Sequence, residues 1–356
     1  MKFSSPAHAE RVTSRIGLAL AVTFTLCFVT GLISHLIQHP PPWFGWPSRP
    51  VWLYRVTQGT HVLSGIASIP LLLAKLWSVY PKLFERPVIR SVAHALERLS
   101  ILVLSAAAFF ELVTGLFNIA QNYPWTFYFP QLHYAVAWVA IGSILVHIAV
   151  KLPKVRLTKE PDPSRRAFLR TTWLAAGVAV VATAGATVPL LRNVSGLSWR
   201  SGKGPQGLPV NRTAAAAGVL DTARDPNWRL SVVTPKGTKT YSLDELRALP
   251  QSSAELPIAC VEGWSQSAHW SGVSLPELLR DAESAPGTPV RVISLDKGIY
   301  GSSDLPGEHT ADELTLLALE LNGEILDIDH GFPCRIIAPN RPGVLQTKWV
   351  TRLETL

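Results

Sequence analysis

Residues 164–192, SRRAFLRTTWLAAGVAVVATAGATVPLLR, divide this 356-residue chain into two parts of different composition. The stretch joins two adjacent arginines and a Phe-Leu pair to an apolar run, about 171–191, that is poor in Leu and rich in Ala, Gly and Val. A run of that length can cross a bilayer. The sequence before it is strongly apolar, whereas about the last 150 residues have the ordinary polarity of a globular domain.

Four further apolar runs precede this stretch, and each has the length of a membrane-spanning helix. They cover about 15–37, 57–80, 97–119 and 131–152. The connections QHPPPWFGWPSRP and QNYPWTFYFP are rich in Pro and aromatic residues, as segments at a membrane interface are. The sequence therefore predicts an all-α membrane bundle of about five transmembrane helices, four of them in a unit over residues 1–155.

The basic residues predict how these helices are oriented. The N-terminal tail, the connection after the second run and the stretch after the fourth carry these Lys and Arg: Lys2, Arg11, Arg15, Lys82, Arg86, Arg90, Arg98, Lys151, Lys154, Arg156, Lys159, Arg165, Arg166 and Arg170. The other two connections carry only Arg49 and Arg55. Because cytoplasmic flanks are enriched in Lys and Arg, the N-terminus is predicted to be cytoplasmic and the part after the fifth run extracytoplasmic. The net charge of +8 is thereby explained without a nucleic-acid partner.

Histidines stand out in the apolar part, because ionisable residues in membrane helices are costly and usually functional. His133 and His147 share the fourth run, and their separation puts them within about 40° of one helix face and about 21 Å apart along the axis. That spacing suits two haems stacked across a bilayer. By depth, His61 matches His133 near the outer side and His94 matches His147 near the cytoplasmic side. The pattern over about 10–155 resembles the bacterial di-haem cytochrome b family, which implies one or two b haems and electron exchange with a quinone.

Three other ionisable residues of this part leave alternatives open. His35 and His39 end the first run and could replace His61 as ligands or line a quinol site, but an interfacial role is the preferred interpretation. Glu111 lies inside the third run and either handles quinol protons or is a carboxylate hydrogen-bonded within the bundle.

The part after the fifth run has the pattern of an α+β domain. Residues 193–227 are rich in Gly, Ser and Ala and are predicted to be linker and irregular coil. Strands are predicted at WRLSVV, PIACVE, VRVISL and CRIIAP, and helices at SLDELRAL and SLPELLRD. The two helices are expected to begin with capping boxes, formed by Ser242 with Glu245 and by Ser274 with Glu277. Because strands and helices do not alternate strictly, the class is α+β.

Three stretches of this domain carry its chemistry: ELPIACVEGWSQSAHWSGVSLPELL, NGEILDIDHGFPCRIIAP and GVLQTKWV. In this order and spacing they resemble the molybdenum-cofactor domain of the sulfite oxidase family, over about residues 228–356. The resemblance implies that Cys260 is the thiolate ligand of molybdenum, which fits the preference of soft ligands for such metals. It also implies that His330, Arg335 and Lys348 hold the pterin and its phosphate, for which cationic donors are suited.

The CVEGWS motif is most similar to the periplasmic methionine-sulfoxide reductase branch of that family. This likeness implies that Glu262 faces the metal and that Asn211 is a second pocket residue. Two departures from the family are visible: the Arg that follows the cysteine in sulfite oxidases is absent, and the C-terminal dimerisation domain is expected to be missing. Cys334, inside the pterin motif, is predicted to be a core residue.

The opening stretch has an explanation once this domain is in view. SRRAFLR resembles the signal of the twin-arginine translocase, which exports folded proteins. A molybdenum cofactor is inserted in the cytoplasm, so its domain has to cross the membrane already folded. Residues 156–192 are therefore interpreted as an internal export signal that is retained as the fifth transmembrane helix.

Taken together, the residues and resemblances predict a membrane-anchored molybdenum oxidoreductase. It would exchange electrons between a quinone pool or another membrane carrier, b haems and molybdenum, with oxygen-atom transfer to or from a small substrate. Reduction of a sulfoxide- or N-oxide-like compound is favoured over a dehydrogenase or oxidase that delivers electrons to quinone. A different class stays open: a haem-only electron carrier whose outer domain is redox-silent.

Overall fold

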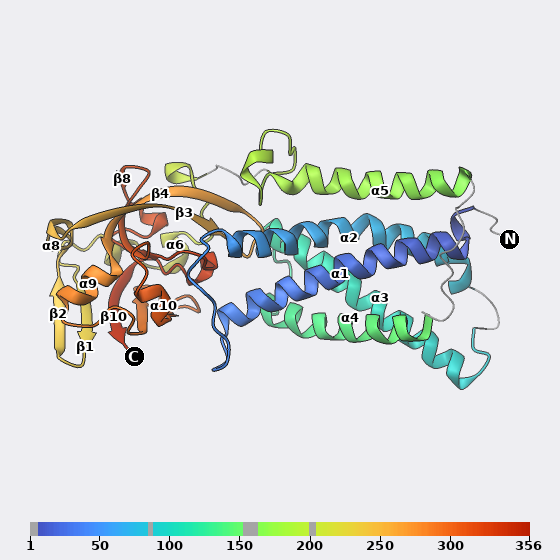
Figure 1. Cartoon of the computed structure of the whole chain (residues 1–356), viewed down its shortest axis with the longest axis horizontal. Helices are drawn as coiled ribbons and strands as arrows, with labels where there is room; N and C mark the ends of the chain where they lie inside the picture. Colours follow the sequence, from blue (N-terminus) through green and yellow to red (C-terminus); the bar gives the residue numbers. More distant parts are fainter. Residues whose placement is uncertain (1–5, 85–87, 152–162, 199–203) are drawn as a thin grey trace. The chain divides into compact units, whose positions relative to one another are not determined.

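The computed structural model describes residues 6–84, 88–151, 163–198 and 204–356, and the chain forms two compact units (Figure 1). The first unit comprises Met1–His35, Gly59–Gly185 and Leu190–Ser198, and the second comprises Leu36–Gln58, Ala186–Pro189 and Trp199–Leu356. Five of the basic residues that predict the orientation lie outside the described residues: Lys2, Arg86, Lys154, Arg156 and Lys159.

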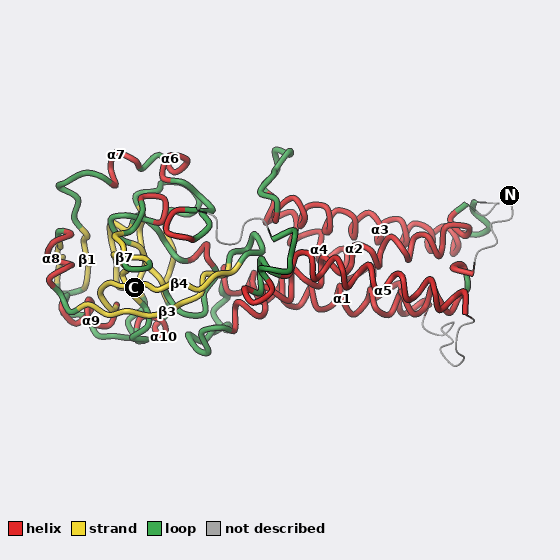
Figure 2. Tube along the Cα trace, turned by 90° about the horizontal axis from the view of Figure 1, so that it is seen from above, coloured by secondary structure: helices red, strands yellow, loops and turns green. Residues whose placement is uncertain are grey.

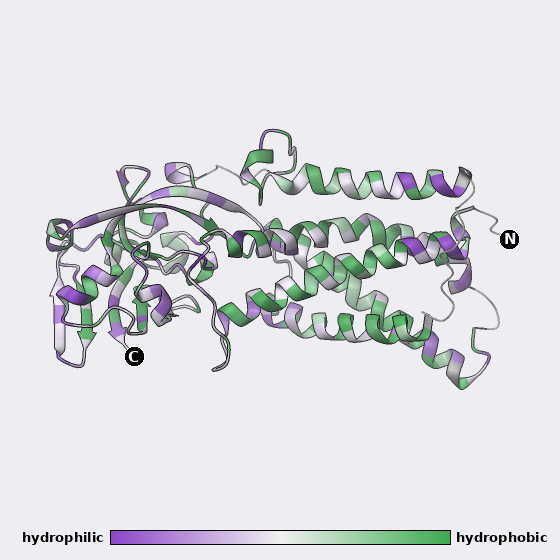
Figure 3. Cartoon of the chain, in the orientation of Figure 1, coloured by the Kyte–Doolittle hydropathy of each residue, from purple (hydrophilic) through white to green (hydrophobic). Residues whose placement is uncertain are grey.

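Long helices account for nearly all of the first unit. They are α1 (Glu10–Gln38), α2 (Leu53–Leu83), α3 (Val92–Ile119), α4 (Phe129–Lys151) and α5 (Pro163–Ala184), with a 3-10 turn η1 (Pro6–His8) before them and η3 (Pro189–Leu191) after them. All five are long and apolar enough to cross a membrane, which confirms the predicted set. Figure 3 shows apolar colour along most of each helix, as expected for surfaces that face lipid.

The fifth helix is displaced from the predicted run of 171–191. It ends at Ala184 because the chain turns back there: the Gly185 N–H donates to Ser195 Oγ at 2.8 Å, and the Leu197 N–H donates to the Ala182 carbonyl at 2.8 Å. At its other end it begins at Pro163, so Arg165 and Arg166 lie in the first helical turn.

Small apolar clusters and polar side chains hold the helices together. Phe24, Leu72 and Ala108 form one buried cluster. The Ser68 hydroxyl donates to Thr23 Oγ1 at 2.8 Å, and the Lys75 ammonium donates to the Thr13 carbonyl at 2.8 Å. Such interhelical hydrogen bonds stabilise bundles in lipid, where apolar side chains gain little by leaving the hydrocarbon.

In its described residues, the second unit is built on two sheets of five strands each, and Figure 2 shows its strands in yellow. One sheet has the order β2 (Gly237–Tyr241), β1 (Leu230–Thr234), β10 (Val350–Thr355), β5 (Val290–Ser294) and β6 (Ser302–Leu305), with only the β1–β10 pair parallel among these strands. The other has the order β3 (Gln251–Ala259), β4 (Ser265–Ser274), β7 (Leu316–Leu321) and β8 (Glu324–Ile325), and β9 (Arg335–Ile337) pairs with β7.

The alternation of side chains along β7 separates two hydrophobic cores. Leu317 and Leu319 face the main core, to which strands of both sheets contribute. Leu316 and Ala318 face a second core, which includes Cys260. The helical elements complete an α+β domain, as predicted. They are η4 (Pro205–Gly207), α6 (Ala214–Ala217), α7 (Leu220–Ala223), α8 (Leu243–Ala248), α9 (Leu275–Asp281), α10 (Gly307–Thr310), η5 (Ile328–His330) and η6 (Gly343–Leu345).

Only one of the two predicted capping boxes forms. At α8, the Ser242 and Glu245 side chains each accept from the other's backbone N–H. The prediction for α9 was wrong: the Ser274 hydroxyl donates to the carboxylate of Glu313 at 3.0 Å, and Glu277 pairs instead with Arg280 at 2.6 Å. Because Arg280 holds the Glu277 carboxylate, that carboxylate does not reach back to the Ser274 N–H, and Ser274 makes no side-chain capping bond.

Part of the segment predicted to be linker and coil belongs to the packed domain. Leu208 lies 1% exposed in the second core, and Ala214 and Val219, also buried, contact Trp349 in a third cluster. Its Gly, Ser and Ala content does not distinguish a flexible linker from a segment whose few apolar side chains are buried.

Candidate functional site

Cys260 lies in the tight turn that joins β3 to β4. The Cys260 N–H donates to the Trp264 carbonyl at 2.8 Å, and the Gly263 N–H donates to the Cys260 carbonyl at 3.0 Å. Gly263 has φ +86°, a conformation that glycine adopts without a steric penalty. The strand predicted to continue to Glu262 therefore ends at Ala259, and the turn presents the cysteine, only 1% exposed, at the tip of the hairpin.

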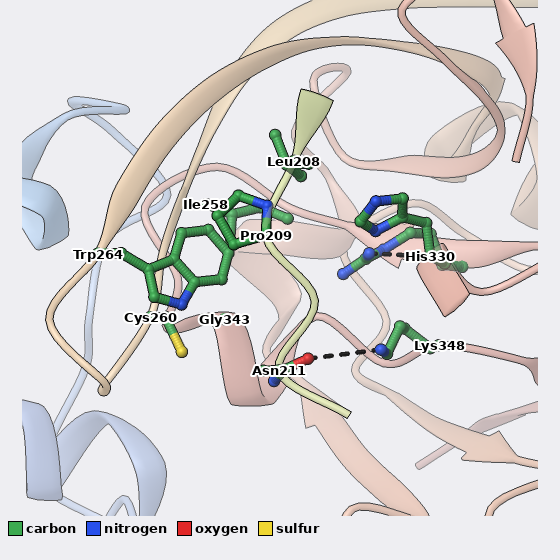
Figure 4. Close-up of a pocket in the computed structure, with 10 residues that line it drawn as sticks. Leu208, Pro209, Asn211, Ile258, Cys260, Trp264, His330, Gly343 and Lys348 are labelled. Atoms are coloured by element: carbon green, nitrogen blue, oxygen red, sulfur yellow. Dashed lines mark hydrogen bonds between the residues drawn. The ribbon is translucent and has the colours of Figure 1, made fainter. Parts of the chain in front are cut away.

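A pocket opens beside this turn (Figure 4). Its lining residues are Leu208, Pro209, Asn211, Ile258, Cys260, Trp264, His330, Arg335, Gly343 and Lys348. Five of the six residues that the sequence assigns to the molybdenum site are among them, although they come from four separate segments. The sixth, Glu262, is not in the lining, but it accepts a hydrogen bond at 3.2 Å from the indole N–H of Trp264, which is. Sequence reasoning missed Trp264 as a pocket residue, although it stands in the CVEGWS motif.

Arg335 is a buried cation at the start of β9. Its guanidinium donates to the carbonyls of His330 at 3.0 Å and Gln346 at 3.1 Å, and it lies 5.1 Å from the centre of the Trp270 ring. Its Nε–H has no partner, and among the described residues no carboxylate lies within ion-pair distance of it. Burial lowers the pKa of Arg335 to about 9.

Lys348 is the second buried cation of the pocket. Its ammonium donates to the carbonyls of Arg212 and Asp329 and lies 3.4 Å from Asn211 Oδ1. Burial, reinforced by the nearby charge of Arg335, lowers the pKa of Lys348 to about 7. An anion in the pocket would raise that pKa again, because an opposite charge favours the protonated form.

His330 and Gly331 bring these cations together. His330 Nε2 lies 2.8 Å from the Pro205 carbonyl, and burial lowers the pKa of His330 to about 4, so the ring is neutral near pH 7 and Nε2–H is the donor. Gly331 has φ +113°, and a Cβ there would lie 3.1 Å from the Cβ atoms of both Arg335 and Lys348. A glycine at this position lets the two cations converge.

The pocket therefore combines a thiol with two buried basic side chains, of which Arg335 has no carboxylate within ion-pair distance in the described part of the chain and Lys348 is influenced by the charge of Asp329. Figure 4 shows Cys260 and Lys348 on opposite sides, with Asn211 between them. Buried unpaired charge is costly, so the arrangement favours an anionic ligand with several oxygen acceptors near Arg335 and Lys348. A soft metal carried by that ligand would meet the Cys260 sulfur. The residues present thus fit a metal bound to a phosphorylated organic cofactor.

Comparison with known proteins agrees with this donor set. The family model described as "Oxidoreductase molybdopterin binding domain" matches residues 217–356. Residues 217–356 are a molybdopterin-binding oxidoreductase domain. This α+β domain is of sulfite oxidase type.

Three curated relatives show the range of proteins that carry a similar domain. The mitochondrial sulfite oxidase of Drosophila melanogaster is 34% identical over 36% of this chain and 27% of its own length. The catalytic subunit MsrP of the protein-methionine-sulfoxide reductase of Ralstonia nicotianae is 33% identical over 37% of this chain and 45% of its own length. A putative protein-methionine-sulfoxide reductase subunit, YedZ1, of Azospira oryzae is 32% identical over 32% of this chain and 42% of its own length. The chain thus spans less than half of each of these relatives.

In the helical unit, two of the histidines predicted to bind haem lie close together. The rings of His61 on α2 and His133 on α4 have centres 6.4 Å apart. His61 Nδ1 lies 2.8 Å from the Cys27 carbonyl, and His133 Nδ1 lies 3.0 Å from the Thr114 hydroxyl.

Glu111 on α3 and His35 on α1 both contact α4. A Glu111 carboxylate oxygen lies 3.1 Å from His133 Nε2, and the His35 ring stacks on Tyr134 with centres 3.6 Å apart. Close packing beside His61 requires Gly31, where a Cβ would lie 2.9 Å from the imidazole. The proximity of Cys27 to His61 was not anticipated from the sequence.

His94 and His147 lie at the same end of the antiparallel α3–α4 hairpin. His94 is the third residue of α3, where its N–H donates to the N-cap Ser91 hydroxyl and its Nδ1 accepts from the Arg90 N–H. His147 lies in the last turns of α4. Their role as ligands of a second haem stays a prediction.

Proposed function

We propose that this chain is a membrane-anchored molybdenum oxidoreductase that couples oxygen-atom transfer on a small substrate to the quinone pool through b haems. The observation that carries the proposal is the convergence of Asn211, Cys260, His330, Arg335 and Lys348 on one pocket of a molybdopterin-binding oxidoreductase domain. When bound, the cofactor supplies the two-electron chemistry of oxygen-atom transfer.

Each pocket residue has a distinct task in this proposal. Cys260 holds the metal through its sulfur, and Arg335 and Lys348 hold the cofactor's phosphate by charge and hydrogen bonds. His330 donates through a neutral ring and so orients the cofactor without adding charge. Glu262, which is not in the lining, would supply a carboxylate near the metal, and it accepts a hydrogen bond from the lining residue Trp264.

The reductive direction, on a sulfoxide- or N-oxide-like substrate, is favoured over oxidation. Support comes from the likeness to the methionine-sulfoxide reductase subunit MsrP and from the absence of the Arg that follows the cysteine in sulfite oxidases. The runner-up is a dehydrogenase or oxidase that delivers electrons to quinone, and the likeness to a mitochondrial sulfite oxidase keeps it open.

His61 and His133 would hold the b haem that exchanges electrons with the molybdopterin domain. The support is the proximity of their rings, with centres 6.4 Å apart, and the hydrogen bond between His61 Nδ1 and a backbone carbonyl, which is typical of metal-binding histidines. His94 and His147 would hold a second haem nearer the cytoplasmic side, and Glu111 would exchange protons with quinol beside the first. The haem-only alternative would leave the buried cations of the molybdopterin domain without a ligand.

Cofactor and substrate analysis tests the proposed function. Purified full-length protein should contain one molybdenum and one or two b haems, and it should reduce at least one compound in a panel of sulfoxides and N-oxides with a quinol as donor. Turnover of sulfite or another reduced compound, with no reduction of the panel, would establish the oxidative direction instead. Haem without molybdenum, in cells that make molybdopterin, would leave the electron-carrier alternative.

The orientation and export route form a second part of the proposal, supported by the basic residues and by Arg165 and Arg166 at the start of α5. Reporter fusions after Gly45, Tyr123 and Leu356 should report outside, and fusions after Arg86 and Pro161 inside. Replacing Arg165 and Arg166 with Lys should keep the molybdopterin domain in the cytoplasm while α1–α4 still insert. Export of that domain in a strain without the twin-arginine translocase would refute the route.

A further inference from the structure

Residues 46–58, here called the connecting segment, link α1 to α2 and include the first turns of α2. They belong to the same compact unit as the molybdopterin domain. Sequence reasoning treated them only as an interfacial loop of the membrane bundle. In the structure they hold the chain on both sides of Cys260.

The first anchor is Asn340, which is 2% exposed and has φ +55°. Its amide oxygen accepts from the Tyr54 N–H at 2.6 Å, its amide nitrogen donates to the Pro47 carbonyl at 2.7 Å, and its carbonyl accepts from the Trp46 indole at 2.8 Å. The connecting segment thus binds the Asn340 side chain through one donor and one acceptor bond of its amide.

Asn340 fixes the segment that packs against the backbone of the Cys260 turn. Two residues later, Pro342 pairs with Ala259 in an isolated parallel bridge. At Gly343, a Cβ would lie 3.5 Å from the Cys260 Cα, so the chain here packs directly behind the cysteine backbone.

The second anchor lies on the other side of Cys260. The Gln58 amide donates to the Val261 carbonyl at 3.4 Å. The Arg55 guanidinium donates to the hydroxyls of Ser265 and Ser267 at 2.8 Å each, where β4 leaves the turn. Val51 packs against the hydrophobic core that contains Cys260.

A third contact binds the connecting segment to the loop before β7. Arg49 binds Asp312 through two hydrogen bonds, at 2.9 and 3.0 Å, and the Asp312 carboxylate is 4% exposed. A bidentate pair of this kind defines both distance and orientation.

We propose that the connecting segment is a positioning element for the Cys260 sulfur, an inference that rests on the proposed function of Cys260 as the metal ligand. The turn itself has two internal backbone hydrogen bonds. The connecting segment adds anchors at Asn340, behind the turn, and at Val261 and β4, which follow Cys260 in the chain. Displacement of a reacting group by about 1 Å can cost about 100-fold in rate. The segment between α1 and α2 thereby positions the metal ligand of the domain with which it forms one compact unit.

The test uses Asn340→Gly, which keeps the positive φ and removes the side chain, and Arg55→Ala, both in the full-length protein. Each variant should retain its molybdenum and its haem absorbance. The electron paramagnetic resonance signal of the Mo(V) state should shift, and kcat with a dye that reduces the molybdenum site directly should fall about 10- to 100-fold, as for outer partners of metal ligands. Arg55→Lys keeps the charge and one donor nitrogen near the two serines. It should recover part of the parent Mo(V) signal and part of the parent kcat.

A matched control comes from the exposed Arg291–Asp304 pair, whose geometry is also bidentate, at 2.8 and 3.0 Å. Arg291→Ala should change neither the Mo(V) signal nor kcat, whereas Arg49→Ala should change both. Unchanged signals in Arg55→Ala and Arg49→Ala at full molybdenum content would overturn the positioning role. Lack of molybdenum in the parent protein would instead reject the proposed function, so the two failures are distinguishable.

Discussion

Replacing Cys260 with serine is expected to abolish turnover at the molybdopterin domain while the haem spectrum stays intact. The sulfur lies in a turn beside two buried cations, and a serine hydroxyl is a harder ligand that remains protonated at neutral pH. Because Cys260 is the proposed direct ligand, activity with either a quinol or a directly reacting dye should fall more than the about 100-fold that outer partners of a metal ligand cost. Activity assays, elemental analysis for molybdenum and haem absorbance measure the three quantities.

Cys334 provides the matched control. It is fully buried, its thiol donates to the Val350 carbonyl at 3.5 Å, and it faces the main core instead of the pocket. Burial strongly raises the pKa of Cys334, so it is an inert thiol. Cys334→Ala should therefore keep molybdenum and activity, at some cost in stability. Parent-like activity in Cys260→Ser would remove the molybdenum assignment of that residue.

The pocket was predictable because its chemistry resides in short local motifs. Cys260 follows a strand with a strong β pattern, and His330, Gly331 and Arg335 stand within six residues of one another, so their relative placement depends little on distant packing. Gly331 and Gly263 mark the turns in the sequence itself. The five apolar runs were predictable for a different reason, since length and hydropathy suffice for a helix in lipid.

Features that depend on long-range packing were not predictable in the same way. Nothing in QHPPPWFGWPSRP indicates that Trp46 and Pro47 bind Asn340, nearly 300 positions away. The buried role of Leu208 is hidden in a segment whose composition is typical of a linker. At Ser274 the local pattern favoured a capping box, but the Ser274 hydroxyl bonds Glu313, 39 positions away, and Glu277 pairs with Arg280.

Replacing His133 with alanine is expected to abolish quinol-coupled turnover, to below about 1% of the parent, yet to leave activity with a dye that reduces molybdenum directly. The reason is that the His133 ring lies 6.4 Å from the His61 ring, centre to centre, and His133 is proposed to hold the same b haem as His61. The haem absorbance and both activities, measured on one preparation, give the comparison.

His35→Ala is the control for that experiment, because His35 is the alternative ligand at the same end of the bundle. In the structure its ring stacks on Tyr134, which gives it a packing role. The variant should keep the haem signal and most of the quinol-coupled turnover. Loss of the signal in His35→Ala, with retention in His61→Ala, would move the ligand role from His61 to His35.

The second haem is tested by His147→Ala, which should remove one haem signal without affecting the signal that depends on His133. The two positions lie about 21 Å apart along α4, by the rise of the helix, which is too far for one iron to use both. If two haems are present, electrons pass between them across the bundle, so His147→Ala should also reduce quinol-coupled turnover when quinol is oxidised near the cytoplasmic side. If quinol is oxidised beside Glu111, that turnover should persist. A single haem signal that His147→Ala leaves unchanged would reject the two-haem relay and leave His61 and His133 as the only pair.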